Sequence, residues 1–237
     1  WFQLWLDLTH LVIAPECWAD NARLVLDELT GQSKNNDGVE TRVPGFGDTA
    51  ALDCLQPSLC SATAAFKAMT DALVEAGYDR NRTLLGAPYD FRYAPFSTVG
   101  KAFQADLRQL IESAVAHTGE RAVVVSHSMG GLQTLHFLVH QTQVWKDAHI
   151  REWVAISAPW GGANKELQDF ASGDSQGLPV KPLTVRIAQR SFETNFWMLP
   201  VPQWHDSAPI VTTPSRNYSA QDYAAFFRDI GHESGFQ

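Results

Sequence analysis

A β-branched run that passes directly into a helical pattern is the feature that most limits how this chain can fold. Residues 121–126 read RAVVVS, which is typical of a strand buried in a parallel sheet, and residues 129–140 show the apolar spacing of a helix. Only His127 and Ser128 stand between the two patterns. The chain must therefore turn sharply from a strand into a helix at these two residues.

The neighbouring segments extend this alternation over residues 61–167. Helical patterns and short apolar runs follow one another in turn: a helix from Ser61 to about Gly77, the run TLLGAP (83–88), a helix that passes through Phe103 and Leu107 and closes at Gly119, and the run WVAIS (153–157). Strands that alternate with helices predict a doubly wound α/β fold, with a parallel sheet between helical layers. Residues 1–60 and 168–237 lack this alternation, which indicates excursions such as a cap or lid within one domain.

Charge and cysteine content narrow the function classes and the compartment. The formal net charge is −8, and the sequence contains no run of basic residues that could form a local positive patch. Both observations argue against nucleic acid as a partner. The apolar runs are too short to cross a bilayer. Cys54 and Cys60 are close enough for a small-loop disulfide and Cys17 has no obvious partner, although three reduced thiols are the alternative. Glycosylation sequons at Asn81 and Asn217 are compatible with the secretory pathway.

Ser128 stands at the apex of the predicted turn, within SHSMGG (126–131). In α/β-hydrolases a nucleophilic serine occupies such a strained turn, with small residues two positions before and after it. Gly130 satisfies this rule, and Ser126 is a mild departure from the usual glycine. We predict Ser128 as the nucleophile and the backbone N–H of Met129, at the positive end of the following helix, as half of an oxyanion hole. The alternative is an ordinary strand-to-helix turn with a surface serine.

A second serine matches the motif more closely but lacks the strand before it and the helix after it. Residues 173–177 read GDSQG and match G-x-S-x-G letter for letter. The preceding NKELQDFA (164–171) is a helical rather than a strand pattern, and Pro179 follows closely, so no strand-to-helix turn is expected there. Ser175 is therefore interpreted as a loop residue.

The acid and base that would activate Ser128 are harder to place. His127 is adjacent to it, but neighbouring side chains at such a turn diverge, so we interpret His127 as structural or substrate-facing. His205 and His232 lie downstream, as the chain order of this fold requires, and could combine with one of four acids: Asp174, Asp206, Asp222 and Asp229. Neither histidine follows a convincing core strand. We expect the acid and the histidine of the triad to lie outside this chain.

Ten stretches spread over nearly the whole chain occur in a familiar order: LWLDL, CWADNARLVLD, VPGFGDT, APYDFRYAP, HSMGGL, WKDAHI, SAPWGG, ASGDSQGLP, WMLP and PSRNYSAQDYAAFFRDIG. In these the chain resembles the lecithin:cholesterol acyltransferase group, which includes lysosomal phospholipase A2 and plant and protist relatives. APYDFR and APWGG are the more specific matches. The resemblance implies an α/β-hydrolase core, a parallel sheet flanked by helices, with lipid-facing and cap insertions.

The resemblance also implies an activity. Ser128 would take an acyl group from a glycerophospholipid as a serine ester and pass it to a sterol, another lipophilic alcohol or water. Such O-acyltransferases and phospholipases work at peripheral membrane or lipoprotein surfaces, are secreted or lysosomal or vacuolar, and use no metal or dissociable cofactor.

Matched to this family, the chain divides into three parts: a lipid-facing and lid segment (1–60), a βαβ core with the nucleophile turn (61–167), and a cap and lid (168–237). The family pattern implies that the domain is incomplete at both ends, that the partner of Cys17 lies upstream, and that the isolated chain is inactive.

Two further groups of residues are candidates for the site. An apolar segment near the N-terminus either packs against a core strand or inserts into a lipid surface, and the resemblance favours insertion for four residues: Leu8, Leu11, Val12 and Ile13. Asp90 and Arg92 either contact the reacting groups or form a buried ion pair that holds their loop. Two alternative functions stay open: a non-catalytic lipid-binding relative, and a carboxylesterase or lipase acting on other acyl esters.

Overall fold

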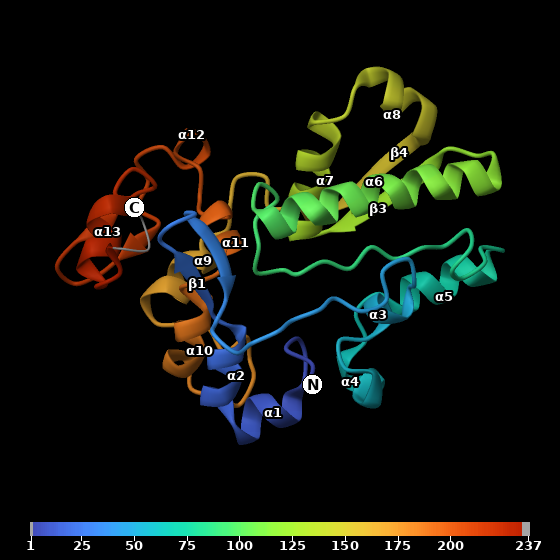
Figure 1. Cartoon of the computed structure of the whole chain (residues 1–237). Helices are drawn as coiled ribbons and strands as arrows, with labels where there is room; N and C mark the ends of the chain where they lie inside the picture. Colours follow the sequence, from blue (N-terminus) through green and yellow to red (C-terminus); the bar gives the residue numbers. More distant parts are fainter. Residues whose placement is uncertain (1, 234–237) are drawn as a thin grey trace. The chain divides into compact units, whose positions relative to one another are not determined.

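The computed structural model describes residues 2–233 and contains the predicted change from strand to helix (Figure 1). β3 (Ala122–His127) leads through α7 (Met129–Val139) and α8 (Gln143–His149) to β4 (Ile150–Ile156). β3 and β4 pair in parallel, so the predicted strand–helix–strand arrangement is confirmed for these residues. The chain is a mixed α/β protein that includes a parallel strand pair.

The described chain falls into two compact units. The elbow unit consists of the chain up to Leu8, Thr41–Phe91 and Pro95–Ala158. The helical unit consists of Thr9–Glu40, Arg92–Ala94 and the chain from Pro159. The predicted segments 1–60, 61–167 and 168–237 do not coincide with these units, because residues 1–60 contribute to both. Their grouping into one domain stays a prediction.

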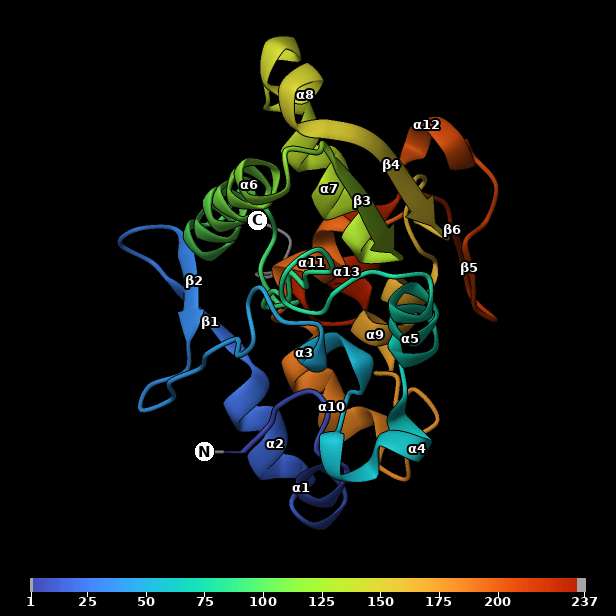
Figure 2. The ribbon, with the colours of Figure 1, turned by 90° about the vertical axis from the view of Figure 1, so that its right-hand side faces the viewer.

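In the elbow unit, helices cover one face of the β3–β4 pair (Figure 2). Paired residues of parallel strands share a face, and the face of Val124 and Trp153 is the one that meets the helices. The core between this face and the helices consists of side chains from α6 (Thr98–Thr118), α7 and α8, namely Leu107, Ile111, Phe137 and Trp145. The opposite face exposes apolar side chains: Val123, Val125, Val154 and Ile156.

The boundaries of α6 follow from its ends. Ser97 is the N-cap, and its hydroxyl accepts a hydrogen bond from the backbone N–H of Gly100 at 3.0 Å. Gly119 ends the helix in the left-handed conformation, with φ of 73°, which glycine adopts without strain. The prediction of a helix closing at Gly119 is confirmed.

The predicted helix from Ser61 to Gly77 is interrupted in its first half: residues 61–63 and 67–75 are helical, and residues 64–66 are not. The chain forms α3 (Ala50–Asp53), a 3-10 turn (Pro57–Leu59), α4 (Cys60–Thr63) and α5 (Lys67–Glu75) instead of one long helix. Residues 64–66 leave the helical path because their backbone pairs with the α3 segment: Ala64 bridges Cys54, and the N–H of Ala65 donates to the carbonyl of Asp53 at 2.8 Å. These long-range hydrogen bonds override the local helical pattern.

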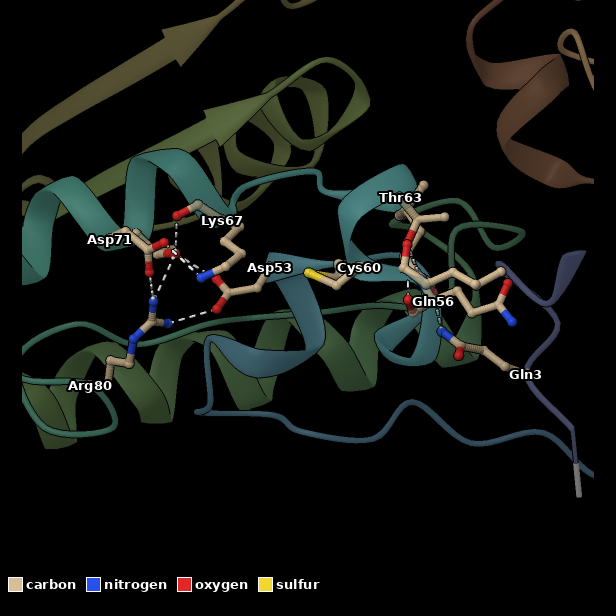
Figure 3. The surroundings of a disulfide bond; sticks show 12 residues. Gln3, Asp53, Gln56, Cys60, Thr63, Lys67, Asp71 and Arg80 are labelled. Carbon is tan, nitrogen blue, oxygen red and sulfur yellow. Dashed lines mark hydrogen bonds and ion pairs between the residues drawn. A yellow bond between two sulfur atoms is a disulfide. The ribbon is translucent and has the colours of Figure 1, made fainter.

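Figure 3 shows what joins these short helices. Cys54 and Cys60 form a disulfide. Arg80 donates to Asp53 at 2.9 Å and to Asp71 at 2.7 Å, and so bridges α3 and α5. The segment from α3 to α5 is therefore held by a disulfide and by the two ion pairs of Arg80 rather than by a large apolar core.

The predicted strand TLLGAP (83–88) is not a strand in the structure, apart from a single bridge between Arg80 and Leu84. The backbone of this run is hydrogen-bonded to another loop instead: the N–H of Gly47 donates to the carbonyl of Gly86 at 2.7 Å. A Cβ on Gly86 would lie 2.3 Å from the carbonyl oxygen of Asp48, so the two backbones approach too closely for any other residue. The parallel sheet predicted from three strands is thus seen as a pair.

The helical unit combines short helices with two hairpins. Its elements are α1 (Leu8–Ile13, from Thr9), α2 (Pro15–Ala22), β1 (Leu24–Asp27), β2 (Gln32–Asn35), α9 (Lys165–Ala171), α10 (Pro182–Gln189), α11 (Glu193–Trp197), α12 (Pro202–His205), β5 (Val211–Thr212), β6 (Asn217–Tyr218) and α13 (Tyr223–Asp229). β1 pairs with β2, and β5 with β6, both antiparallel. An aromatic core joins α9 to α13 through Phe170, Phe226 and Phe227. Across residues 2–233, no helix is both long and apolar enough to span a membrane.

Candidate active site

Ser128 is the single residue between β3 and α7, and its backbone is strained. Its backbone angles are φ 53° and ψ −130°, which a residue with a Cβ rarely adopts. The residue is exposed, and within residues 2–233 its side chain makes no hydrogen bond. A strained residue at the junction of a strand and a helix, with its hydroxyl open to solvent, has the geometry expected of a nucleophile turn.

Backbone hydrogen bonds hold this conformation in place. The N–H of Ser128 donates to the carbonyl of Ile156 on β4 at 2.9 Å, and the carbonyl of Ser128 accepts from Gly131 at 2.9 Å. The first bond continues the parallel ladder by one step beyond the end of β3. Strain of this kind persists only where the surroundings determine the backbone, and β4 supplies that determination here.

Small residues surround the turn as predicted. A Cβ built on Gly130 would lie 3.8 Å from the Cβ of Ser126, so the positions before and after Ser128 are in contact. Ser126 is buried, and its hydroxyl accepts a hydrogen bond from the indole N–H of Trp153 on β4 at 2.8 Å. The serine that replaces the usual glycine therefore has a defined partner.

The N-terminus of α7 faces the same turn. Met129 is the first residue of this helix, so its N–H belongs to the group that has no partner inside the helix. The helix dipole places partial positive charge at this end. An oxyanion formed on a group attached to Ser128 would meet that charge, which fits the predicted role of Met129.

Tyr89 lies on the other side of the turn. Its hydroxyl is 3.8 Å from the position of a Cβ on Gly130, and its ring packs against Phe103 at 5.1 Å between centroids. Burial raises the pKa of the Tyr89 hydroxyl, which is therefore neutral at physiological pH. Tyr89 thus presents a neutral polar group beside the turn.

The histidines of the chain have other contacts. His127 packs edge-on against Phe66, with 5.8 Å between ring centroids. In the helical unit, His205 Nε2 hydrogen-bonds to the carbonyl of Gly161 and His232 Nε2 to that of Arg190, each at 3.1 Å. The absence of a triad acid and histidine from the chain stays a prediction. Ser175 lies in the loop between α9 and α10, as predicted.

The predicted lipid-facing residues divide into two groups. Leu11 is only 1% exposed, so its assignment to a lipid surface is corrected: it points inward from α1. Val12 and Ile13, the next two residues of the same helix, are 44% and 77% exposed, and Leu8 is half-buried. A short helix presents only one face outward, and here that face carries Val12 and Ile13.

Asp90 and Arg92 fall in different units. Arg92 is fully buried in the helical unit, where it donates to the carbonyl of Ala22 at 3.0 Å and to the side chain of Asn35 at 2.9 Å. Asp90 is half-buried in the elbow unit. The observed contacts of Arg92 hold the β1–β2 segment, which is a structural task.

The remaining candidates lie at the surface. Asn81 and Asn217 are both exposed, and Asn81 has a positive φ of 63°, a conformation that asparagine tolerates well. Cys17 is an exposed free thiol. Among the described residues, no cluster of three or more histidine, cysteine or acidic side chains is placed to bind a metal ion.

Sequence reasoning missed Trp153 and Tyr89. Trp153 was assigned only to an apolar run, and nothing in that run distinguishes an indole that donates to Ser126 from one that merely fills the core. Tyr89 stands within the matching stretch APYDFR, which marked the segment but not the contact with Gly130.

Comparison with known proteins gives a consistent result. The family model described as lecithin:cholesterol acyltransferase matches residues 1–236. The human protein named lysosomal phospholipase A and acyltransferase is 44% identical over 239 residues, covering 100% of this chain and 58% of the relative. Lecithin-cholesterol acyltransferase-like 1 of Arabidopsis thaliana is 42% identical, covering 99% of the chain and 57% of the relative.

A third relative is the phosphatidylcholine-sterol acyltransferase of Gallus gallus, which is 38% identical, covering 100% of the chain and 57% of the relative. The chain thus spans between 57% and 58% of the length of these three relatives.

Proposed function

Because the chain belongs to the lecithin:cholesterol acyltransferase family, we propose that Ser128 takes an acyl group from a glycerophospholipid and transfers it to an alcohol or to water. The observation that carries this proposal is the backbone of Ser128, with φ 53° and ψ −130° at the strand-to-helix junction. Its relatives are named as phospholipases and acyltransferases, which favours acyl transfer over a non-catalytic lipid-binding role or a general carboxylesterase.

The proposed chemistry follows from the groups around the turn. The Ser128 hydroxyl attacks the ester carbonyl of the phospholipid and loses its proton to a histidine, and the carbonyl oxygen becomes an oxyanion. The N–H of Met129 donates to that oxyanion. When the oxyanion collapses, the bond between the acyl carbon and the glycerol oxygen breaks, and that oxygen takes the proton from the histidine and leaves as the lysophospholipid. An alcohol or water then gives its proton to the histidine and attacks the serine ester, and the Ser128 oxygen leaves with that proton.

We propose that the acid and the histidine of the triad lie outside residues 1–237. His205 and His232 are each engaged with a backbone carbonyl in the helical unit, which supports this placement. The proposed architecture is an α/β-hydrolase core, of which β3, α7 and β4 form the central step. On this basis we expect the isolated chain to lack turnover.

Several surface features support action at a lipid surface in the secretory pathway. Val12 and Ile13 are exposed apolar side chains on one helix, suited to insertion into a membrane or lipoprotein surface. The Cys54–Cys60 disulfide and the exposed sequon asparagines suit an oxidising compartment, which we take to be lysosomal, vacuolar or extracellular.

A serine-reactive fluorophosphonate probe tests the nucleophile directly. The protein expressed from its complete reading frame should be labelled, and the labelling should disappear in Ser128→Ala. Ser175→Ala is the matched control, because it removes the serine of GDSQG, and it should be labelled like the wild type. Equal labelling of Ser128→Ala and wild type would refute the assignment.

The same preparations then test the substrate class. Phospholipid liposomes that contain a lipophilic alcohol should yield lysophospholipid together with an acylated alcohol or a free fatty acid, and Ser128→Ala should yield neither. Labelling without phospholipid turnover would retain the nucleophile and reject the glycerophospholipid substrate.

A further inference from the structure

We infer that Trp153 is a positioning residue for Ser128, because its indole N–H anchors Ser126 and so helps to hold the strained turn. This inference rests on the proposed role of Ser128 as the nucleophile. It also accounts for the serine at position 126, where the motif of such turns has glycine.

The register of the two strands places the two side chains together. Ser126 pairs with Ala155, and Trp153 stands two residues earlier on β4. Side chains at this diagonal spacing share a face and lie within reach of a long side chain. The indole Nε1 accordingly lies 2.8 Å from the Oγ of Ser126. The acceptor end of this bond is buried, since Ser126 is only 9% exposed, so water has limited access to its hydroxyl.

The bond acts two residues before the strained position. β4 already holds Ser128 by one backbone bond, from its N–H to the carbonyl of Ile156 at 2.9 Å. The Trp153 side chain on β4 adds a second attachment, through its hydrogen bond to Ser126 near the end of β3. With both in place, the end of β3 has little freedom to move, and the positive φ of Ser128 is the conformation that remains.

Removing one partner has a different consequence from removing both. If Trp153 loses its N–H, the buried hydroxyl of Ser126 is left without its donor, and the β3 end can relax to find another partner. If Ser126 is also replaced by glycine, no unpaired hydroxyl remains and the turn has the residue that the motif usually contains. The two changes should therefore not be additive.

The test measures the second-order rate constant with which a fluorophosphonate probe labels Ser128, per folded molecule, in the protein from its complete reading frame. Trp153→Phe keeps the aromatic bulk and removes the donor, and we expect about a tenfold slower rate. Ser126→Gly alone removes the hydroxyl that accepts from the indole N–H and should also slow labelling. The double variant should recover to within about threefold of wild type.

Trp145→Phe is the matched control. Its indole also donates a hydrogen bond in the elbow unit, to Glu112 at 2.7 Å, but on α8 rather than on the strand beside Ser128. It should lower the melting temperature and leave the labelling rate per folded molecule unchanged. A purely structural role for Trp153 would give the same pattern as Trp145, and that result would overturn the inference.

The outcomes separate the inference from the proposed function. If Ser128→Ala is still labelled, the proposed nucleophile is wrong. If Ser128→Ala is unlabelled but Trp153→Phe labels at the wild-type rate, the nucleophile stands and the positioning role fails. If Trp153→Phe does not fold, Ser126→Gly tests the same bond, and labelling at the wild-type rate by that variant also overturns the inference.

Discussion

Replacing Glu166 by glutamine is expected to remove much of the pH dependence of the helical unit. Glu166 and Asp169 lie one turn apart on α9 and are only 8% and 7% exposed. Among residues 2–233, one oxygen of each, Oε2 of Glu166 and Oδ1 of Asp169, finds no hydrogen-bond partner. The nearest cation, Lys165, pairs with Asp174 at 2.7 Å, and Asn195 donates to the other oxygen of Asp169 at 3.3 Å.

These surroundings favour the protonated carboxyls. Burial, and then the charge of Asp169, raise the pKa of Glu166 from 4.5 to about 8. Burial, and then the charge of Asp174, raise the pKa of Asp169 from 3.8 to about 7. Lys165 acts in the opposite direction on both, with a smaller effect. Both carboxyls are therefore neutral in the folded state under mildly acidic conditions.

The sign of the effect follows from linkage. A folded-state pKa above the unfolded value contributes stability that is complete below pH 4.5 and is lost as the pH rises through about 8. At about 1.4 kcal/mol per pKa unit, the shift of Glu166 corresponds to a loss on the order of 5 kcal/mol over this range. Domains are stable by only about 5–15 kcal/mol, so the loss is large.

Urea unfolding followed by circular dichroism at pH 5, 6, 7 and 8 measures this loss. The midpoint of the wild type should fall over this range, and the fall should be reduced by roughly half in Glu166→Gln, which keeps the shape and removes the titration of Glu166 while Asp169 still titrates. The control is Glu75→Gln, an exposed carboxylate of the elbow unit, which should keep the wild-type slope. A Glu166→Gln protein with the wild-type slope would refute the reasoning.

Two further substitutions test the packing of the helical unit, both by urea unfolding. Gly162→Ala should lower the free energy of unfolding by more than about 2 kcal/mol, because Gly162 has φ of 88° and a Cβ there would lie 2.4 Å from the carbonyl oxygen of Leu199; an unchanged midpoint would contradict this. Arg92→Met should cost about 3 kcal/mol, since it removes the buried donor to the carbonyl of Ala22 and to the side-chain oxygen of Asn35; a loss below about 1 kcal/mol would show that these bonds matter little.

Local sequence was sufficient where local interactions determine the structure. α6 begins at a serine cap and ends at a glycine in the left-handed conformation, and both signals are readable in the sequence. The strand β3 and the helix α7 follow from a β-branched run and an apolar helical spacing. Each of these elements has its reason within its own residues.

The errors lie where distant backbone contacts decide. Residues 64–66 were predicted as helix but bond to the α3 segment, and TLLGAP was predicted as a strand but bonds to the loop around Gly47. Leu11 fitted an apolar surface stripe, yet it packs inward. No periodicity within one segment reports the partner that a segment far along the chain will offer.

The candidate site shows the same division. Ser128 was identified from its strand-to-helix context, whereas the bond between Trp153 and Ser126 depends on strand register and joins residues 27 positions apart in the chain. A register is set by the pairing of β3 with β4 and is not written in either strand alone. Sequence therefore located the candidate nucleophile and could not locate what holds it.

The two serine motifs differ physically in which residue takes up the strain. In GDSQG the positive φ angles belong to Gly173, Gln176 and Gly177, at 76°, 51° and 79°, and not to Ser175. In SHSMG the positive φ belongs to the serine itself, at 53°, and the residue that replaces the first glycine is buried and hydrogen-bonded. Glycines at the correct spacing can thus serve a loop alone. A nucleophile turn requires that the serine adopt the unfavourable conformation, and that neighbouring strands hold it there at a cost of about 1–3 kcal/mol.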